Sequence, residues 1–244
     1  MIKSVSKDFI YNKYSSNLTK RGKTIVLFHG WGSSASKYHD FAENLMSLGF
    51  KVVVPEIIYH DSRNKLENHF NKEVMQEYFW KTIFRSIDDS KLLLEKLGEE
   101  EKDIILMGIS MGGFIANGIF ASGNHFAGLI NINGSGSFLL SEKIFRENDC
   151  RPEMTDEEMY KINVYNPLGK VHSGSPILLM HGEQDSIVSI EGQKEYYNYL
   201  TEANAHYDVQ LIVFDEVNHI FSEEMWESLK QWLDQKFFVL KDIH

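Results

Sequence analysis

The chain alternates between continuous apolar runs and longer stretches in which apolar residues recur at helical spacing. Continuous apolar runs are typical of parallel strands that are buried on both faces. Such runs occupy residues 23–29, 50–55, 104–107, 128–134, 176–181 and 209–214. Helical spacing predicts helices over residues 35–48, 73–97, 113–120, 190–203 and 223–240. Because strands alternate with helices, we predict an α/β fold with a mostly parallel sheet and helices on both faces.

Three stretches depart from this alternation. A weak two-residue alternation around Ile10 predicts one or two antiparallel edge strands near the start of the chain. Residues 56–71 are polar and irregular, so we expect a loop there. Residues 135–170 are too many for a simple connection and mix apolar with charged side chains, which predicts two or three short amphipathic helices. We therefore predict one domain over residues 1–244, with a small helical lid inserted at about 135–170.

The candidate chemistry starts at Ser110, in the pentapeptide Gly108-Ile109-Ser110-Met111-Gly112 between a predicted strand and a predicted helix. A G-x-S-x-G sequence in that context is typical of a nucleophile elbow, a sharp turn that exposes the serine above the sheet. The two glycines remove Cβ atoms that would obstruct the strand and helix as they fold back on each other. The N–H of Met111, at the start of the helix, is suited to binding an oxyanion. We therefore predict Ser110 as the nucleophile and Met111 as a backbone oxyanion donor.

A serine hydroxyl needs a base within hydrogen-bond reach and a group that orients the base. In doubly wound sheets such groups gather at the carboxyl ends of strands. The candidates after the last two predicted strands include the acids Glu183, Asp185 and Asp215 and the histidine His219. We predict His219 as the base and Asp185 as the acid, which gives the chain order serine, acid, histidine. Glu183 or Asp215 could orient the base instead.

A second oxyanion donor is expected in the loop after the strand predicted over residues 23–29. There the chain reads His29-Gly30-Trp31-Gly32. Glycines on both sides of Trp31 let the backbone approach a substrate and leave the Trp31 N–H free to point inward. We predict Trp31 as this donor, the alternative being an ordinary glycine turn.

These motifs together resemble the α/β-hydrolase superfamily, over about residues 23–240. Four landmarks carry the resemblance in chain order: HGWG, GISMGG, HGEQD and the final Asn218-His219. The resemblance implies the α/β-hydrolase fold, with Ser110 as nucleophile, His219 as general base and Asp185 as the acid. It also implies Trp31 and Met111 as backbone oxyanion donors.

Within that superfamily, residues 55–63 are similar to the P…HGxR stretch of small bacterial esterases. Those esterases are related to dienelactone hydrolase and to prolyl-oligopeptidase-type catalytic domains. Asp61 stands where that stretch usually has glycine. Residues 163–168 also resemble the segment by which such proteins return from the cap to the strand before the acid.

The composition limits the classes of binding partner that we expect for this protein. A formal net charge of −10 argues against nucleic acid or an anionic membrane as the main partner, since either would need a basic surface. Cys150 is the only cysteine, which excludes an intrachain disulfide and argues against a thiolate metal cluster. His60 and His69 lie in the irregular loop without a convincing ligand set, so we interpret them as solvated. The first residues lack the apolar core of a secretory signal, and no apolar run has membrane-spanning length, so we expect a cytoplasmic protein.

The resulting hypothesis is a serine hydrolase that cleaves carboxylic esters of small to medium acyl groups through an acyl-enzyme intermediate. We expect no metal or organic cofactor, a small-molecule ester as the binding partner, and a monomer or homodimer. A thioesterase, an acyltransferase, a C–C hydrolase or a peptidase would use the same triad. A catalytically idle binding or scaffold protein is the alternative from another class.

Overall fold

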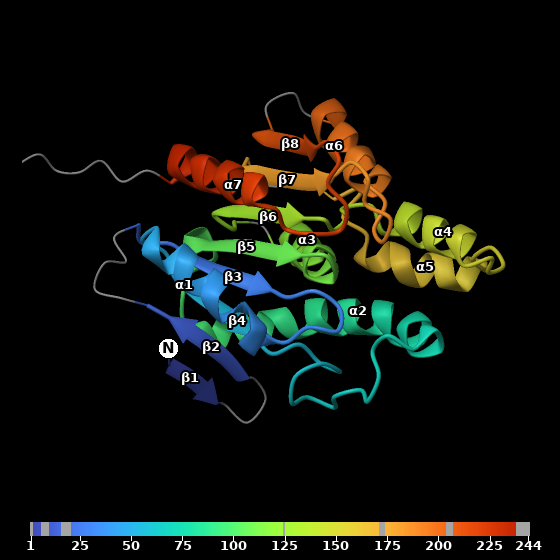
Figure 1. Cartoon of the computed structure of the whole chain (residues 1–244), viewed down its shortest axis with the longest axis horizontal. Helices are drawn as coiled ribbons and strands as arrows, with labels where there is room; N and C mark the ends of the chain where they lie inside the picture. Colours follow the sequence, from blue (N-terminus) through green and yellow to red (C-terminus); the bar gives the residue numbers. More distant parts are fainter. Residues whose placement is uncertain are drawn as a thin grey trace, which may run out of the picture.

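An eight-stranded sheet forms the centre of the computed structural model (Figure 1). The structure describes residues 2–5, 10–15, 21–123, 125–170, 174–203 and 207–237. The strands lie in the order β1-β2-β4-β3-β5-β6-β7-β8. Their bounds are β1 Ile2–Val5, β2 Ile10–Tyr14, β3 Thr24–Phe28, β4 Lys51–Pro55, β5 Ile104–Ile109, β6 Gly128–Ile132, β7 Ile177–Gly182 and β8 Val209–Phe214. Each apolar run therefore forms the strand that the sequence predicts.

Strands β3 to β8 run parallel, and β1 and β2 are antiparallel at one edge. In register, Val26 of β3 lies between Val53 of β4 and Leu106 of β5. Because the parallel strands end on the same side, the loops after β3, β5, β7 and β8 meet along one rim of the sheet. The predicted mostly parallel sheet and the antiparallel edge strands are both confirmed.

Helices cover both faces of the sheet. Their bounds are α1 His39–Ser47, α2 Lys72–Leu97, α3 Met111–Ser122, α4 Phe138–Asn148, α5 Asp156–Tyr165, α6 Glu191–Ala203 and α7 Glu223–Lys236, with short 3₁₀ turns at Ala35–Tyr38 and Glu101–Asp103. Alternate residues of β3 point to opposite faces: Leu27 packs in the core with α1 and α7, and Val26 packs in the core with α2, α3 and α6.

Two helix ends show how local chemistry sets the boundaries. Helix α2 begins after Asn71, whose side chain accepts a hydrogen bond from the Val74 N–H, and ends at Gly98 in the left-handed region. Helix α7 ends at Lys236, and Phe237 leaves the helical region at φ −125°. The prediction that this helix runs to residue 240 is therefore too long at Phe237, and its last three residues lie outside the described part.

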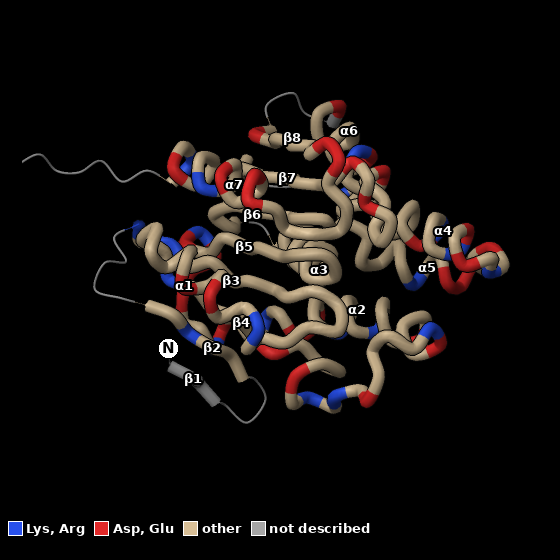
Figure 2. Tube along the Cα trace, in the orientation of Figure 1, with Lys and Arg blue, Asp and Glu red and all other residues tan. Residues whose placement is uncertain are grey.

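The segment predicted to form a lid, residues 135–170, contains helices α4 and α5. Both lie beyond the carboxyl ends of the parallel strands, where the arrowheads point in Figure 1. Tyr165 of α5 stacks on Phe84 of α2 with 4.3 Å between ring centroids, and its hydroxyl donates to Asp88 at 3.0 Å. Both helices carry acidic and basic residues (Figure 2). No helix in the described ranges combines the length and the apolar character needed to cross a membrane.

Candidate active site

Ser110 occupies a strained turn between β5 and α3. Its backbone has φ 57° and ψ −124°, a conformation that few residues other than glycine adopt. The Ser110 N–H donates to the Ile132 carbonyl at 2.8 Å, which ties the turn to β6. A Cβ at Gly108 would lie 1.9 Å from the Gly112 carbonyl oxygen, and one at Gly112 would lie 2.0 Å from the Phe28 carbonyl oxygen. Only glycine fits at both positions, so the backbone has the geometry of a nucleophile elbow.

The structure brings Ser110, His219 and Asp185 together from three different strand ends. His219 Nε2 lies 2.8 Å from Ser110 Oγ, and His219 Nδ1 lies 2.7 Å from Asp185 Oδ2. The other two acids considered for this position, Glu183 and Asp215, are exposed on the surface. Of these three acids, Asp185 is the one whose carboxylate lies within hydrogen-bond distance of His219 in the described structure.

Asp185 is held as an ionised carboxylate. Its Oδ1 accepts from the backbone N–H groups of Ile187 and Val188, both at 2.9 Å, and His181 Nε2 lies 3.2 Å from Oδ2. Burial alone would raise the pKa of Asp185, but the hydrogen bonds from His181 and His219 hold it far below its usual range. An ionised carboxylate accepts only, so His219 Nδ1 carries the proton and Nε2 is left to accept from the Ser110 hydroxyl.

Two asparagines fix the loops that carry the acid and the histidine. Asn133 is buried after β6; its Oδ1 accepts from the Gly182 N–H at 3.1 Å and its Nδ2 donates to the Ile220 carbonyl at 2.8 Å. Asn218 Oδ1 accepts from the Ser186 N–H at 3.0 Å and from the His219 N–H at 2.7 Å. These roles were not assigned from the sequence, although the asparagines at 131 and 133, which make this strand run more polar than its neighbours, were a signal.

The segments that carry the two predicted oxyanion donors both adjoin Ser110. A Cβ at Gly30 would lie 3.3 Å from Ser110 Cβ, so the loop that carries Trp31 passes directly against the serine. Met111 is the first residue of α3. Among the described residues, neither the Trp31 N–H nor the Met111 N–H donates to a protein acceptor. Both amides are therefore available to a ligand at Ser110.

Asp61, which stands where related stretches have glycine, anchors this loop. Its carboxylate accepts from the backbone N–H of Ala35 at 2.8 Å and of Ile57 at 3.1 Å, and lies 2.9 Å from His29 Nε2. Burial would raise the pKa of Asp61, but these hydrogen bonds lower it overall. His29 Nδ1 lies 2.9 Å from the Gly30 carbonyl oxygen, so both ring nitrogens lie within hydrogen-bond distance of an oxygen atom.

The interpretation of His60 and His69 as solvated is wrong. They are 1% and 9% exposed, and their ring centroids lie 4.3 Å apart. Both rings meet the Trp31 side chain edge-on, at 4.8 and 5.5 Å. Burial lowers the pKa of His60 to about 3. The polarity of residues 56–71 did not reveal that the loop folds back beneath Trp31. In the described part of the chain, no group of three or more histidine, cysteine or acidic residues could hold a metal ion.

A cavity of about 540 Å³ opens over Ser110 and His219. Much of its wall is apolar, formed by Trp31, Phe70, Met75, Phe79, Trp80, Phe145, Ile187 and Val188. Its polar lining, apart from Ser110, His219 and Ser186, comes from helix α2 and from α4 with the turn that follows it: Gln76, Glu142, Asn148, Asp149 and Arg151. Residues of the segment 135–170 therefore line this cavity.

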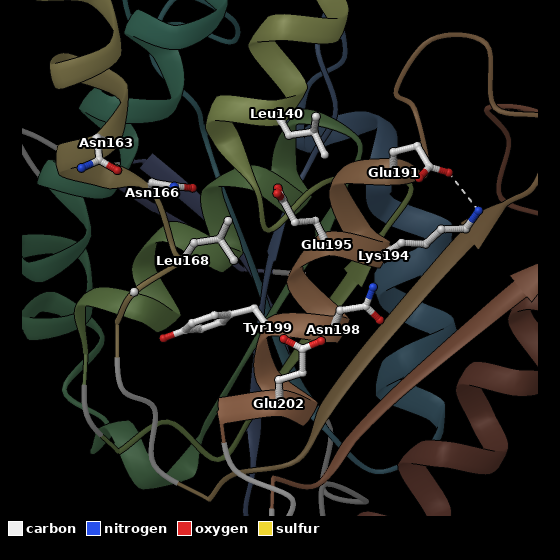
Figure 3. Close-up of a pocket in the computed structure, with 11 residues that line it drawn as sticks. Leu140, Asn163, Asn166, Leu168, Glu191, Lys194, Glu195, Asn198, Tyr199 and Glu202 are labelled. Atoms are coloured by element: carbon white, nitrogen blue, oxygen red, sulfur yellow. Dashed lines mark hydrogen bonds and ion pairs between the residues drawn. The ribbon is translucent and has the colours of Figure 1, made fainter.

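A second hollow of about 620 Å³ lies between α6 and the segment that follows α5 (Figure 3). Its described lining includes Asn166, Leu168, Glu195 and Tyr199, and neither Ser110 nor His219. The larger hollow is therefore separate from the serine.

Comparison with known proteins places the chain in a family. Residues 11–231 match the dienelactone hydrolase family. Esterase YjfP of Escherichia coli (strain K12) is 26% identical over 193 residues, which cover 73% of this chain and 74% of that protein. Among solved structures, TT1662 from Thermus thermophilus has a TM-score of 0.70 at 15% identity, covering 98% of this chain and 100% of that chain. Acylaminoacyl peptidase from Pyrococcus horikoshii has a TM-score of 0.69 at 17% identity, covering 97% of this chain but 41% of that chain.

The structural neighbours and the relative named as an esterase lead to the same assignment. The structural neighbours share the strand-and-helix arrangement over nearly the whole chain, and the relative named as an esterase supports a hydrolase of the esterase type. The chain belongs to the dienelactone hydrolase family and has the α/β-hydrolase fold.

Proposed function

We propose that the protein is a serine esterase that hydrolyses carboxylic esters of small to medium acyl groups through an acyl-enzyme on Ser110. The observation that carries the proposal is the hydrogen-bonded chain from Ser110 Oγ to His219 at 2.8 Å and from His219 to Asp185 at 2.7 Å. A serine, a histidine and an ionised acid in this arrangement supply a nucleophile, a base and an orienting group.

In the acylation step, Ser110 Oγ attacks the ester carbonyl carbon while its proton passes to His219 Nε2. The carbonyl oxygen becomes an oxyanion, which accepts hydrogen bonds from the Trp31 and Met111 amides. The carbon–oxygen bond to the alcohol then breaks, and His219 Nε2 returns the proton to the departing alkoxide. The products are an acyl-serine and a neutral alcohol.

In the deacylation step, water attacks the acyl-serine and gives one proton to His219 Nε2. Collapse of the second tetrahedral intermediate releases the carboxylic acid, and the proton returns to Ser110 Oγ. Asp185 stabilises the imidazolium in both steps, because its carboxylate faces Nδ1 at 2.7 Å. No metal or organic cofactor takes part in either step.

The cavity supports the proposed substrate size. Its volume of about 540 Å³ and its aromatic walls suit an apolar group of small to medium length. Exclusive hydrolysis of long-chain lipids, or exclusive cleavage of peptides, would contradict this part of the proposal.

The alternatives that share the triad are a thioesterase, an acyltransferase and a peptidase. The relatives named as esterases, YjfP of Escherichia coli (strain K12) and the putative esterase YitV of Bacillus subtilis (strain 168), favour an esterase among these alternatives. An idle binding protein is disfavoured by the positions of the Trp31 and Met111 amides beside Ser110, which a binding role would not require.

A fluorophosphonate probe tests the serine mechanism, because it labels only an activated serine. We expect one label per chain, lost in Ser110→Ala and kept in Ser122→Ala, which alters an exposed serine of the same helix. The esterase class is tested by the turnover of p-nitrophenyl esters against acyl-CoA thioesters across chain lengths. Absence of label on folded wild-type protein would favour the binding protein, and faster turnover of thioesters would favour a thioesterase.

A further inference from the structure

The cavity over Ser110 has a polar end that the proposed hydrolysis does not use. Gln76 of α2 lines it together with Asn148, Asp149 and Arg151, which come from the end of α4 and the turn that follows. No hydrogen bond joins these side chains to Ser110, His219 or Asp185 in the described structure. A pocket that accepted only an apolar chain would have no need of a guanidinium at this position.

Aromatic rings separate the two ends. Trp31, beside Ser110, lies 6.0 Å from Phe79 between ring centroids, and Phe79 lies 5.6 Å from Phe145 of α4. Asn148 follows Phe145 by three residues on the same helix, so the two side chains share a helix face. A ligand that reaches from Ser110 to Asn148 therefore passes an apolar stretch before it meets polar groups.

Arg151 keeps unused donors at this polar end. Its Nη1 donates to Glu142 at 3.0 Å, and its Nε lies 3.5 Å from an Asp149 oxygen, too far and too poorly aligned for a hydrogen bond. The Nε atom is buried without a hydrogen-bond partner among the described residues. The Nη2 group also donates to no described residue, and because Nε is buried, Nη2 is the guanidinium donor left for an oxygen of a ligand in the cavity.

The charge of Arg151 is already matched. Glu142 also accepts from Arg146 at 2.7 Å, and Asp149 accepts from Gln76 at 2.8 Å and from Lys72 at 3.0 Å. Three cations and three carboxylates thus form one connected group: Lys72, Arg146, Arg151, Glu142, Asp149 and Glu158. A further carboxylate from a ligand would leave the group with an uncompensated negative charge, whereas a neutral oxygen would not.

In the proposed binding mode, the acyl arm, rather than the alcohol, lies toward this end. The leaving alcohol must receive its proton from His219, and the residues next to the acid and histidine loops include Ile187, which is 61% exposed. An alcohol that leaves on this exposed side leaves the rest of the cavity to the acyl chain. An acyl chain whose carbonyl oxygen accepted from the Trp31 amide would then lie along Trp31 and Phe79, toward Arg151.

We propose that the preferred substrate carries a neutral oxygen acceptor, such as a ketone or a second ester carbonyl, at the far end of an apolar acyl chain, where Arg151 binds it. This inference rests on the proposed esterase function. It makes Arg151 a residue that selects the substrate, through a hydrogen bond and not through an added ion pair.

Matched p-nitrophenyl esters test the proposal. The hexanoate ends in a methyl group, the 5-oxohexanoate adds a ketone oxygen, and the glutarate monoester replaces the terminal methyl of that ketone with a charged oxygen. We expect kcat/KM of wild-type protein to be about tenfold higher for the 5-oxohexanoate than for the hexanoate, the usual size of a hydrogen bond from a charged donor. The glutarate monoester, corrected for its uncatalysed hydrolysis, is expected to remain below the 5-oxohexanoate.

Variants assign the preference to one side chain. In Arg151→Gln we expect the ratio between the two esters to fall to within about twofold, and Arg151→Lys, which keeps a cation and a donor, should give an intermediate ratio. Lys143→Gln removes the same charge from the exposed side of α4, outside the cavity, and should keep the wild-type ratio. Because both esters are measured on the same sample, the ratio of their kcat/KM values does not depend on the fraction of folded protein. A poorly folded variant therefore still gives an interpretable ratio.

Each outcome of these measurements has one interpretation. Equal wild-type rates for the hexanoate and the 5-oxohexanoate, or a preference that survives in Arg151→Gln, would overturn the inference and leave the esterase proposal intact. Faster hydrolysis of the glutarate monoester would overturn the choice of a neutral group. Failure of wild-type protein to hydrolyse any of the three esters would overturn the proposed function itself, and this inference with it.

Discussion

The rim of the sheet and the lid segment face the same cavity, but they are built by different interactions. At the rim, Asp185 is held by backbone N–H groups and Asn133 joins two loops through buried hydrogen bonds. In the lid segment, α4 and α5 are joined by Arg146, which reaches from Glu142 to Glu158. Main-chain contacts fix atoms closely, whereas charged side chains can be exchanged without altering the sheet. The rim is therefore suited to chemistry and the lid to selection of the substrate.

The largest effect is expected at the rim, for Asp185→Asn. An amide in place of the carboxylate favours the wrong tautomer of His219, and by analogy with other serine hydrolases kcat should fall about 10⁴-fold. Steady-state hydrolysis of p-nitrophenyl butyrate measures the loss. Glu183→Gln, an exposed acid two residues earlier, is the matched control and should retain wild-type kcat. A decrease of less than tenfold in Asp185→Asn would remove Asp185 from the proposed triad.

His60, which packs against the Trp31 ring, is expected to make the stability of the protein depend on pH. Burial lowers the pKa of His60 from 6.5 to about 3. Between those values the unfolded chain binds a proton at residue 60 that the folded chain does not. The free energy of unfolding should therefore fall as the pH falls from 6.5 toward 3, by about 2–4 kcal/mol from this residue.

Urea unfolding of wild-type protein and His60→Phe across that pH range measures this contribution. The difference in unfolding free energy between the two proteins should change with pH in the stated direction. His125→Gln, which alters an exposed histidine, should follow the wild-type curve. Parallel curves for wild type and His60→Phe would show that the buried ring does not couple folding to protonation.

The smallest effect is expected in the lid segment, for Arg146→Gln. The change removes the links from Glu142 to Glu158 and to the Pro152 carbonyl, and should lower the unfolding free energy by about 1 kcal/mol, since Glu142 keeps Arg151 as a partner. Thermal unfolding measures this loss. The kcat for p-nitrophenyl acetate should stay within about threefold of wild type. A hundredfold fall in kcat would show that the lid segment takes part in the chemistry, as the rim does, and would contradict the distinction between them.

The same distinction explains what the sequence could predict. Strands buried on both faces leave continuous apolar runs, so the sheet was predicted from residues such as Ile104 to Met107. The positions of Asp185 and His219 followed because parallel strands end on one side and their loops must meet there. Both predictions depend on backbone regularity, which local sequence reports well.

Contacts made by side chains over long distances were not predictable in this way. The burial of His60 depends on where its loop folds relative to Trp31, and the pairing of Glu142 with Arg151 depends on the packing of the lid turn. Asn133 could have been noted as a polar residue in an apolar run, but its two partners lie 49 and 87 residues away. Polarity identifies such residues without identifying what they touch.

The turn between α4 and α5 also provides a site for attaching a spectroscopic probe. Cys150, the single cysteine of the chain, is exposed in this turn, directly before Arg151. A maleimide dye or a spin label would attach at this one position in the native sequence, with no other thiol to remove. Paired with a second probe on the sheet, it would record the position of the lid turn in individual molecules during turnover.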